Sequence, residues 1–237
     1  MIIVYNFIFL TSMKHIVVLS GAGVSAESGI KTFRDADGLW EGHDVMEVAS
    51  PQGFRMNPEL VLGFYNQRRK QLLTVKPNQA HIDLATLEKD YNVTIITQNV
   101  DDLHERAGSK NVIHLHGELL KARSTFNEES VVDCKTDINF GDMCQSGYQM
   151  RPHIVWFGEA VPMMDKAMEI CATADILIII GTSMQVYPAA SLMHYVPENT
   201  PVYFIDPKPA LLNQKNITVV EETATVGVKK VIDNYLS

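Results

Sequence analysis

Two histidines at the end of an apolar run could take part in proton transfer. In "VIHLHGE" (112–118), His114 and His116 are two residues apart, so a strand would place both on one face. The pKa of histidine lies near neutral pH, and a histidine at a strand end is well placed to act as a general base. We interpret His116 as that base and His114 as a structural residue. A pair of metal ligands is the alternative, and it would need further ligands.

A cluster of polar side chains follows another apolar run, in "TQNVDDLHERAG" (97–108). Ligands of open α/β sheets bind at the carboxyl ends of the strands, which is where these residues would lie. Asn99 can both donate to and accept from a carboxamide, whereas the carboxylate of Asp101 can only accept. We therefore expect Gln98, Asn99 and Asp101 in a binding site. For Asp102 we favour a helix cap, a common use of aspartate.

Two turns rich in small residues could approach phosphate groups closely. "HIVVLSGAGVSAESGI" (15–30) is a β-branched run followed by Gly21, Ala22 and Gly23, in a G-x-G-x-x-G/A pattern typical of dinucleotide sites. "GTSMQVYPAA" (181–190) likewise follows a buried run, and its Gly181, Thr182 and Ser183 suit a phosphate or a ribose. Each turn could also serve packing or helix capping. The acidic residue expected after a second strand is missing, which disfavours an ordinary dehydrogenase.

Alternating strands and helices must position these residues. Short β-branched runs occur at 15–20, 93–97, 111–117, 153–158, 175–181, 202–206 and 217–220. Segments with helical character lie between most of them, which predicts an α/β fold with a mostly parallel sheet. "ILIII" is apolar throughout, as in a strand that is covered on both faces. Residues 31–58 and 121–150 break the alternation, and we expect irregular structure or a smaller inserted domain there.

The length, net charge and cysteine content of the chain narrow the classes to which the protein can belong. The 237 residues suffice for one large domain with an insertion, and the net charge of -8 argues against a protein that binds nucleic acid through phosphate contacts. Three widely spaced cysteines favour a reducing, cytoplasmic setting over a disulfide framework. The apolar residues 1–12 are too short to span a bilayer. We interpret them as an extension ahead of a natural start at Met13, with an edge strand or a tail as alternatives.

Five motifs in order resemble those of the sirtuins, NAD-dependent protein-lysine deacylases. They are "GAGVSAESGIKTFRDADGLW", "TQNVDDLHERAG", "HLHGE", "RPHIVWFGEAVP" and "GTSMQVYPAA". The resemblance implies one catalytic domain over 13–237, with a Rossmann-like parallel sheet covered by helices on both faces. It also implies a small domain inserted at about 31–75 and 121–150. NAD and an acyl-lysine peptide would bind between the two parts, and the products would be nicotinamide, deacylated lysine and O-acyl-ADP-ribose.

The resemblance also assigns site residues. His116 would be the catalytic base, and Phe33 would shield the reactive ribose from water. The residues that would bind NAD are Gly21, Ala22, Gly23, Ser25, Phe33, Arg34, Trp40, Gln98, Asn99, Asp101, Gly181, Thr182, Ser183, Asp206 and Ala224. Phe157, Gly158 and Glu159 would border the peptide cleft.

The sequence departs from the sirtuin pattern in two places. Sirtuins usually carry two C-x-x-C pairs that bind a structural zinc, but here those positions hold Ser124 with Asn127 and Met143 with Ser146. Cys134 and Cys144 fit neither pair, so we predict that no structural zinc is bound and that the small domain is mobile. Asp206 stands where the family usually has a strand-end asparagine, which puts the affinity for NAD in doubt.

The stretch "FYNQRRKQLL" (64–73) bears on the substrate. Alone, a tyrosine and two arginines on a helix are more often a solvated turn than a site. The resemblance changes this, because Tyr65 and Arg68 match a Y-x-x-R pair of class III sirtuins that faces the acyl pocket. It implies removal of succinyl and malonyl as well as acetyl groups, since arginine can grip a carboxylate through two bonds. We expect Arg69 to be the solvated residue.

Three functions compete at this stage. The leading one is deacylation of acyl-lysine proteins or peptides, with no nucleic acid or membrane partner. Mono-ADP-ribosyl transfer would share the release of nicotinamide, and a non-catalytic NAD-binding scaffold would fit the loss of the zinc ligands. The presence of His116, Asn99 and Asp101 argues against a scaffold. The sequence does not indicate the oligomeric state.

Overall fold

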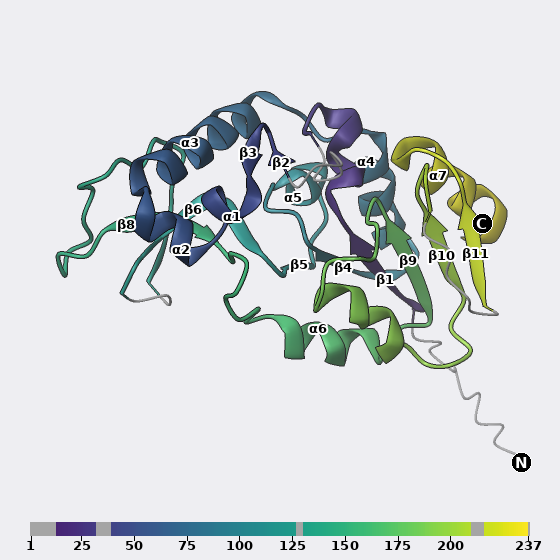
Figure 1. Ribbon diagram of the computed structural model, residues 1–237. Coiled ribbons are helices and arrows are strands. Elements are labelled where there is room, and N and C mark those ends of the chain that lie inside the picture. Colours follow the sequence, from purple (N-terminus) through teal and green to yellow (C-terminus); the bar gives the residue numbers. More distant parts are fainter. Residues whose placement is uncertain (1–12, 32–38, 127–129, 210–215, 237) are drawn as a thin grey trace, which may run out of the picture.

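The central element of the protein is a six-stranded sheet (Figure 1). A computed structural model describes residues 13–31, 39–126, 130–209 and 216–236. The strands are β1 (His15–Ser20), β4 (Asn92–Thr97), β5 (Val112–His114), β9 (Ile176–Ile180), β10 (Val202–Ile205) and β11 (Ile217–Val220). Every neighbouring pair is parallel, in the order β11-β10-β9-β1-β4-β5. The predicted Rossmann-like α/β fold is confirmed.

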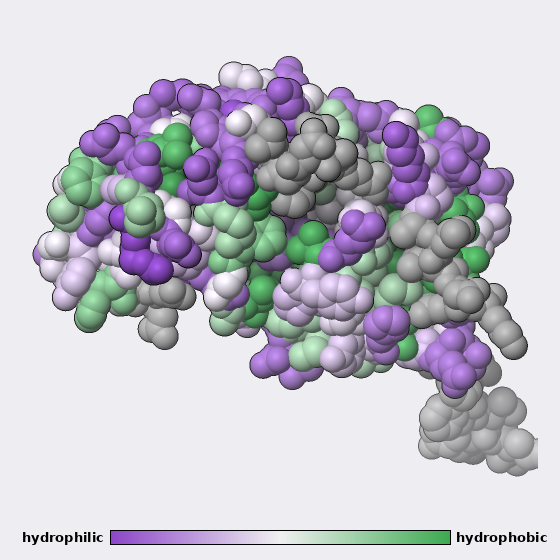
Figure 2. All heavy atoms as spheres, viewed as in Figure 1, coloured by the Kyte–Doolittle hydropathy of each residue, from purple (hydrophilic) through white to green (hydrophobic). Residues whose placement is uncertain are grey.

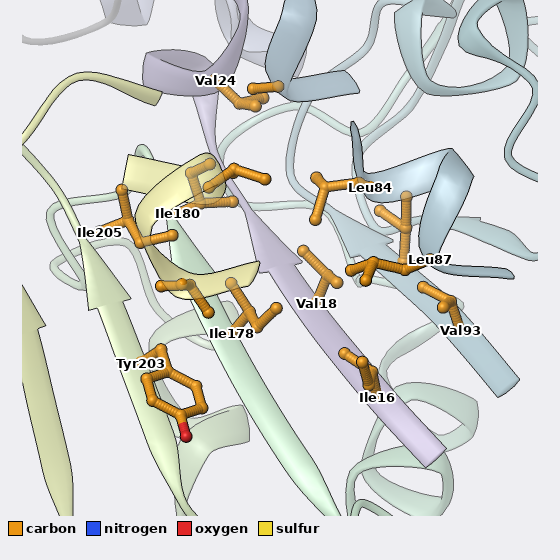
Figure 3. Close-up of a cluster of buried hydrophobic side chains, with 14 of the residues drawn as sticks. Ile16, Val18, Val24, Leu84, Leu87, Val93, Ile178, Ile180, Tyr203 and Ile205 are labelled. Atoms are coloured by element: carbon orange, nitrogen blue, oxygen red, sulfur yellow. The ribbon is translucent and has the colours of Figure 1, made fainter. Parts of the chain in front are cut away.

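The sheet is covered by helices on both faces, as its continuous apolar strands require. Ile16 and Val18 of β1 pack in one cluster with α4 (Gln79–Thr86) and α7 (Ala224–Val231), shown in Figure 3. The alternate residues Val17 and Leu19 pack in a second cluster with α6 (Met164–Cys171) and the 3-10 helix η3 (Ala189–Tyr195). Because strand side chains alternate, each strand residue supports one of the two helical layers.

The strand order creates a crevice at the carboxyl edge of the sheet. From β1 the chain continues to β4 and β5 on one side, and then to β9, β10 and β11 on the other. Helices on the two sides of such a reversal lie on opposite faces, so ligands bind at the strand ends beside it. The reversal lies between β1 and β9, and the two turns rich in small residues follow these two strands.

A second, smaller part of the protein lies beside this edge, at the left of Figure 1. It contains an antiparallel sheet of β7 (Val131–Asp133), β6 (Gly117–Ser124) and β8 (Met150–Ile154), in that order. The hairpin of β2 (Leu39–Trp40) and β3 (His43–Asp44) leads into the helices α1 (Val45–Val48), α2 (Pro51–Met56) and α3 (Pro58–Thr74). These helices share a core with Leu119, Ile154 and Trp156.

The remaining short helices join the main elements. They are η1 (Ala22–Ser28), η2 (Leu87–Lys89), α5 (Leu103–Ala107) and η4 (Ile232–Leu236). Hydrophilic residues cover much of the face in Figure 2. In the described ranges no helix is long and apolar enough to cross a membrane. Cys134, Cys144 and Cys171 are free thiols.

The expectation of irregular structure over 31–58 is wrong for the part that the structure describes. Each short helix there begins at a side-chain cap: the Asp44 carboxylate accepts from Met46 N at 2.7 Å, and the Ser50 hydroxyl accepts from Gly53 N at 2.9 Å. The side-chain amide oxygen of Asn57 accepts from Leu60 N at 3.1 Å. Helices of four and six residues are too short to show an apolar period, so only their caps could have revealed them.

Candidate active site

A cavity of about 310 Å³ lies between the carboxyl edge of the large sheet and the smaller part. Residues after β1, β4 and β9 form one wall, and α3 and the segment after β8 form the other. It is lined by many of the predicted site residues: Gly21, Ala22, Gly23, Trp40, Tyr65, Arg68, Gln98, Asn99, Asp101, His116, Phe157, Gly158, Glu159, Gly181, Thr182 and Ser183. The structure thus gathers residues that are far apart in the sequence.

A few predicted residues are not in this lining. Ser25 is fully buried behind it, against Asn99 and Asp101. Asp206 and Ala224 are buried at the end of β10 and the start of α7, outside the cavity wall that the described residues form. Phe33 and Arg34 lie outside the described residues. The roles of these residues stay predictions.

The two glycine turns fit together without room for side chains. Gly23 donates its N–H to the carbonyl of Gly181 at 2.8 Å, and a Cβ on Gly23 would lie only 2.6 Å from the Gly181 Cα. Gly181 itself has a φ of 63°, a region that favours glycine. The glycines therefore have a packing role at the switch point. They also leave the cavity wall free of side chains at this place.

His116 presents an unprotonated nitrogen for proton transfer. Its Nδ1 lies 3.0 Å from the carbonyl oxygen of Gln98, which can only accept, so Nδ1 carries the proton in the neutral ring. Nε2 is then the basic nitrogen. Burial lowers the pKa of His116, which keeps the ring neutral at physiological pH. A histidine in this state can act as a general base.

Asp101 and Asn99 are held by a shared serine. The Ser25 hydroxyl donates to the Asp101 carboxylate at 3.0 Å and accepts from Asn99 Nδ2 at 3.2 Å. Burial raises the pKa of Asp101 to about 6, and hydrogen bonds from Leu103 N and Ser25 limit the rise. The two polar side chains are thereby fixed at the cavity wall.

The predicted cap of α5 is formed by a different aspartate. Asp102 stands at the N-cap position, directly before the helix, but its side chain makes no capping bond and instead pairs with Arg106. The carboxylate of Asp101 accepts from Leu103 N at 3.1 Å. The prediction for Asp102 is therefore wrong, because Asp101 is one residue further from the helix and can turn its carboxylate back to the free N–H.

His114 supports the backbone of this wall. Its Nδ1 lies 3.1 Å from the Asn99 carbonyl and its Nε2 lies 2.7 Å from the Glu105 carboxylate. Both partners are acceptors, so these contacts favour the ring that is protonated on both nitrogens. Although burial opposes the charged form, the bonds to Glu105 raise the pKa of His114 above its ordinary value.

Tyr65 and Arg68 both line the cavity from α3. Tyr65 is fully buried, and its oxygen accepts a hydrogen bond from Trp156 Nε1 at 3.0 Å. The Arg68 guanidinium lies 4.8 Å from the centre of the Phe64 ring. Within the described residues, the Nε and Nη1 of Arg68 are buried without a hydrogen-bond partner. An arginine with unused donors beside a phenol suits an acidic group.

The expectation that Arg69 is solvated is wrong. Arg69 is 1% exposed, and it donates to the Leu119 carbonyl at 3.1 Å and to the Asn66 side chain at 2.8 Å. The turn of about 100° per residue does separate it from Arg68. That side of α3 faces β6 and not solvent, so the guanidinium is buried between the helix and the small sheet.

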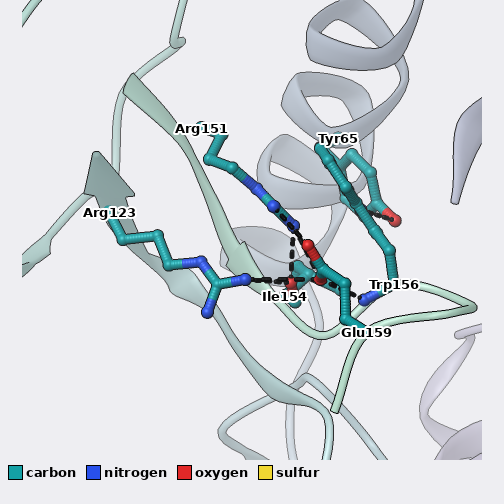
Figure 4. A network of polar contacts seen from close by, with 6 residues as sticks. All are labelled: Tyr65, Arg123, Arg151, Ile154, Trp156 and Glu159. Atoms are coloured by element: carbon teal, nitrogen blue, oxygen red, sulfur yellow. Dashed lines mark hydrogen bonds and ion pairs between the residues drawn. The ribbon is translucent and has the colours of Figure 1, made fainter. Parts of the chain in front are cut away.

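A network of charges fixes the segment after β8 (Figure 4). Arg151 contacts the Glu159 carboxylate through both terminal nitrogens, at 2.6 and 3.1 Å, and Arg123 lies 3.3 Å from it. Glu159 also accepts from Trp156 N at 2.8 Å. These bonds to Arg151 and Trp156 lower the pKa of Glu159 despite its burial. Glu159 therefore shapes the cavity wall, while its carboxylate is engaged inside the protein.

Trp156, Arg151 and Arg123 are functional candidates that the sequence reasoning missed. The Arg151 guanidinium carbon lies 3.3 Å from the centre of the Trp156 ring, so the two side chains are stacked. Arg151, Trp156 and Glu159 lie in one motif, "RPHIVWFGEAVP", so a charged pair eight residues apart was a local signal for part of the network. Arg123 lies on β6, and no local pattern links it to Glu159.

At the expected zinc positions in the smaller part, the residues that the structure describes do not offer the donors of a zinc site, and Asn127 lies outside those residues. Ser124 lies there with Cys144, whose thiol is 3.5 Å from the serine hydroxyl, and the Phe126 and Tyr148 rings stack beside them at 4.3 Å. Among the described residues, no three His, Cys, Asp or Glu side chains group as metal ligands. One thiol with hydroxyl and apolar neighbours does not suit Zn²⁺. The absence of structural zinc stays a prediction, and so does the mobility of this part.

Known proteins are similar to this chain in sequence and in structure. The Sir2 family profile matches residues 21–188. An NAD-dependent protein deacylase of Helicobacter pylori is 59% identical over 225 residues, which are 94% of this chain and 98% of that protein. A Sir2 homologue solved with NAD matches with a TM-score of 0.84 and 40% identity, over 93% of this chain and 89% of that one. A Sir2 structure with an acetylated peptide matches with a TM-score of 0.78 and 27% identity, over 93% of each chain.

Proposed function

The chain belongs to the Sir2 family and is an NAD-dependent protein deacylase, and we propose that it removes succinyl and malonyl as well as acetyl groups from lysine. The acyl-lysine peptide would enter between the two parts of the protein, beside Phe157 and Gly158. The proposed range of acyl groups rests on two side chains of α3, Arg68 and Tyr65.

The observation that carries the proposal is the unsatisfied guanidinium of Arg68. Its side chain is 17% exposed, and two of its nitrogens are buried without a hydrogen-bond partner in the described part of the chain. A buried cation without such partners is costly, and a carboxylate at the end of an acyl chain would supply them. An acetyl group has no carboxylate, so it would fit the cavity without using Arg68.

Tyr65 would supply a further donor to the same carboxylate. Its oxygen already accepts from Trp156 Nε1, which leaves its own O–H free to donate. Burial raises the pKa of Tyr65, so the phenol keeps its proton throughout the physiological range. Together, Tyr65 and Arg68 would bind an acidic acyl group by charge and by geometry.

The described residues of the cavity fit NAD. The side chains of Gln98, Asn99, Thr182 and Ser183 offer donors and acceptors for ribose and carboxamide, and the glycine turns leave the backbone open to phosphates. NAD supplies the electrophilic ribose and the nicotinamide leaving group. His116 would take a proton from a ribose hydroxyl at Nε2, while the Gln98 carbonyl holds Nδ1. Asp101 and Asn99 would orient the nicotinamide end.

A peptide panel tests the proposal. Peptides with acetyl-, succinyl- or malonyl-lysine are incubated with NAD, and nicotinamide and deacylated peptide are followed by mass spectrometry. We expect all three to be deacylated. Arg68→Met should reduce kcat/KM for the succinyl peptide about 100-fold, the loss of roughly 3 kcal/mol of charge-assisted hydrogen bonding, and should change the acetyl reaction little. Equal losses on both peptides would contradict the proposed role of Arg68.

A further inference from the structure

A carboxylate of the protein itself lies next to Arg68. Glu41 is in the turn between β2 and β3, with a φ of 53°, which is unusual for a residue other than glycine. Its neighbour Trp40 anchors the hairpin to α3, with ring centres 4.9 Å from Phe64 and 6.1 Å from Tyr65. The turn thereby directs the Glu41 side chain into the cavity wall, where it is 12% exposed.

Glu41 stands between two cations. One carboxylate oxygen lies 3.0 Å from Lys31 Nζ, and the other lies 4.0 Å from Arg68 Nη1. The first distance is that of a close ion pair, whereas the second is too long for a hydrogen bond. Glu41 therefore attracts Arg68 without satisfying its donors. Its charge is balanced mainly by Lys31, which is 66% exposed.

We propose that Glu41 is a specificity-determining residue that opposes the binding of acidic acyl groups at Arg68. A substrate carboxylate at Arg68 would come close to the Glu41 carboxylate, and the two like charges would repel each other. Lys31 limits this repulsion, because it holds the Glu41 charge on the side away from Arg68. The balance of Glu41 and Lys31 would thus set how strongly the site prefers an acidic chain to acetyl. This inference rests on the proposed role of Arg68.

Two substitutions should shift the preference in opposite directions. Glu41→Gln removes the repelling charge but keeps the size of the side chain. We expect it to lower KM for the succinyl peptide about threefold to tenfold, the range for a partly exposed charge pair. Lys31→Met removes the cation that balances the Glu41 charge. The repulsion between Glu41 and the substrate carboxylate should then increase, which raises the KM for the succinyl peptide. The acetyl peptide carries no charge at this point, so its KM should change little in either variant.

The experiment measures kcat and KM of the full chain for acetyl and succinyl peptides of the same sequence, at low and high salt. Glu47→Gln removes the same charge from an exposed position on α1 and serves as the control, with no change in preference. The double variant Glu41→Gln with Arg68→Met should show no benefit from the first change. The gain in Glu41→Gln should shrink at high salt.

The outcomes separate the inference from the function on which it rests. If Arg68→Met changes the ratio of succinyl to acetyl activity but Glu41→Gln leaves it unchanged, or raises the succinyl KM, the inference is wrong and the substrate range stands. A raised KM would mean that Glu41 only holds Arg68 in place. If Arg68→Met leaves the ratio unchanged, the proposed substrate range is wrong as well. If Glu41→Gln folds poorly, the Lys31→Met variant still tests the inference. Lys31 is exposed, so its replacement should leave the fold intact, and the succinyl KM should rise.

Discussion

Trp156 donates its indole N–H to the hydroxyl of Tyr65, at 3.0 Å, from the segment that follows β8 to a helix 91 residues earlier in the chain. The bond fixes which way the phenol proton can point. The Arg151 guanidinium stacks on the other side of the same ring system and is itself held by Glu159. The end of the cavity beside Tyr65 is therefore built from α3 and from the segment after β8.

Replacing Trp156 by phenylalanine should weaken the binding of substrates with an acidic acyl group more than the binding of acetyl substrates. The ring packing is largely kept, but the Tyr65 oxygen loses its donor and the phenol can turn away. We expect KM for a succinyl peptide to rise about fivefold, which corresponds to a hydrogen bond of about 1 kcal/mol. Steady-state kinetics with matched succinyl and acetyl peptides measures the effect.

Tyr65→Phe provides the partner for a double-mutant cycle. Since Trp156 would act through the phenol, the double variant should lose no more succinyl activity than Tyr65→Phe alone. Additive losses in the two positions would show that Trp156 does not work through Tyr65.

Arg68 and Arg69 should differ in their effect on stability. Arg69 is buried with bonds to Leu119 and Asn66, so Arg69→Met removes two buried hydrogen bonds of a charged group and should lower the free energy of unfolding by about 3 kcal/mol. Arg68→Met removes a cation of which two nitrogens are buried without a hydrogen-bond partner in the ranges that the structure describes, and stability should stay the same or rise. Urea unfolding of the two variants makes the comparison. A similar decrease in the free energy of unfolding for both variants would contradict the difference between the two arginine environments.

The positions of these arginines show how far local sequence patterns can predict the site. The apolar runs and the glycine turns predict the sheet and its ligand-binding edge, because buried parallel strands and close backbone contacts leave local signals. The burial of Arg69 has no such signal, since it depends on contact with Leu119 of β6, which lies 50 residues further along the chain. The same holds for the contact between Arg123 and Glu159. Long-range packing decides which face of α3 meets solvent.

Activity should fall on the acidic side of neutrality. As the proposed base, His116 would act only when neutral, and burial lowers its pKa below the ordinary value, so the base would remain available down to mildly acidic pH. Asp101, with its pKa raised to about 6, loses its negative charge in the same range. We expect kcat/KM for NAD to be level from about pH 8 to 7 and to fall near pH 6 and below. A midpoint above pH 7 would conflict with both burial effects.

Stability should also depend on pH, through His81. This residue is fully buried, and burial lowers its pKa from 6.5 to about 4. The unfolded chain therefore binds more protons than the folded one between pH 6.5 and 4, and the histidine costs stability as pH falls through this window. The loss reaches about 3 kcal/mol at the lower end.

Comparison with His81→Gln isolates this contribution. Asp101 and His114, whose pKa values are raised in the folded protein, stabilise it as pH falls, but both residues are present in wild type and variant. The difference in unfolding free energy between wild type and variant, from urea titrations at pH 7.5 and 5, should move in favour of the variant at the lower pH. A difference that stays constant with pH would contradict the assignment to His81.

The most direct test of the whole account is one assay with a succinyl-lysine peptide and NAD, followed by mass spectrometry of all products. We predict stoichiometric formation of nicotinamide, free-lysine peptide and O-succinyl-ADP-ribose, abolished in His116→Ala and strongly reduced in Arg68→Met. Deacylation of the acetyl peptide alone, with the succinyl peptide unchanged by the wild-type enzyme, would contradict the assignment of Tyr65 and Arg68 to an acidic acyl group.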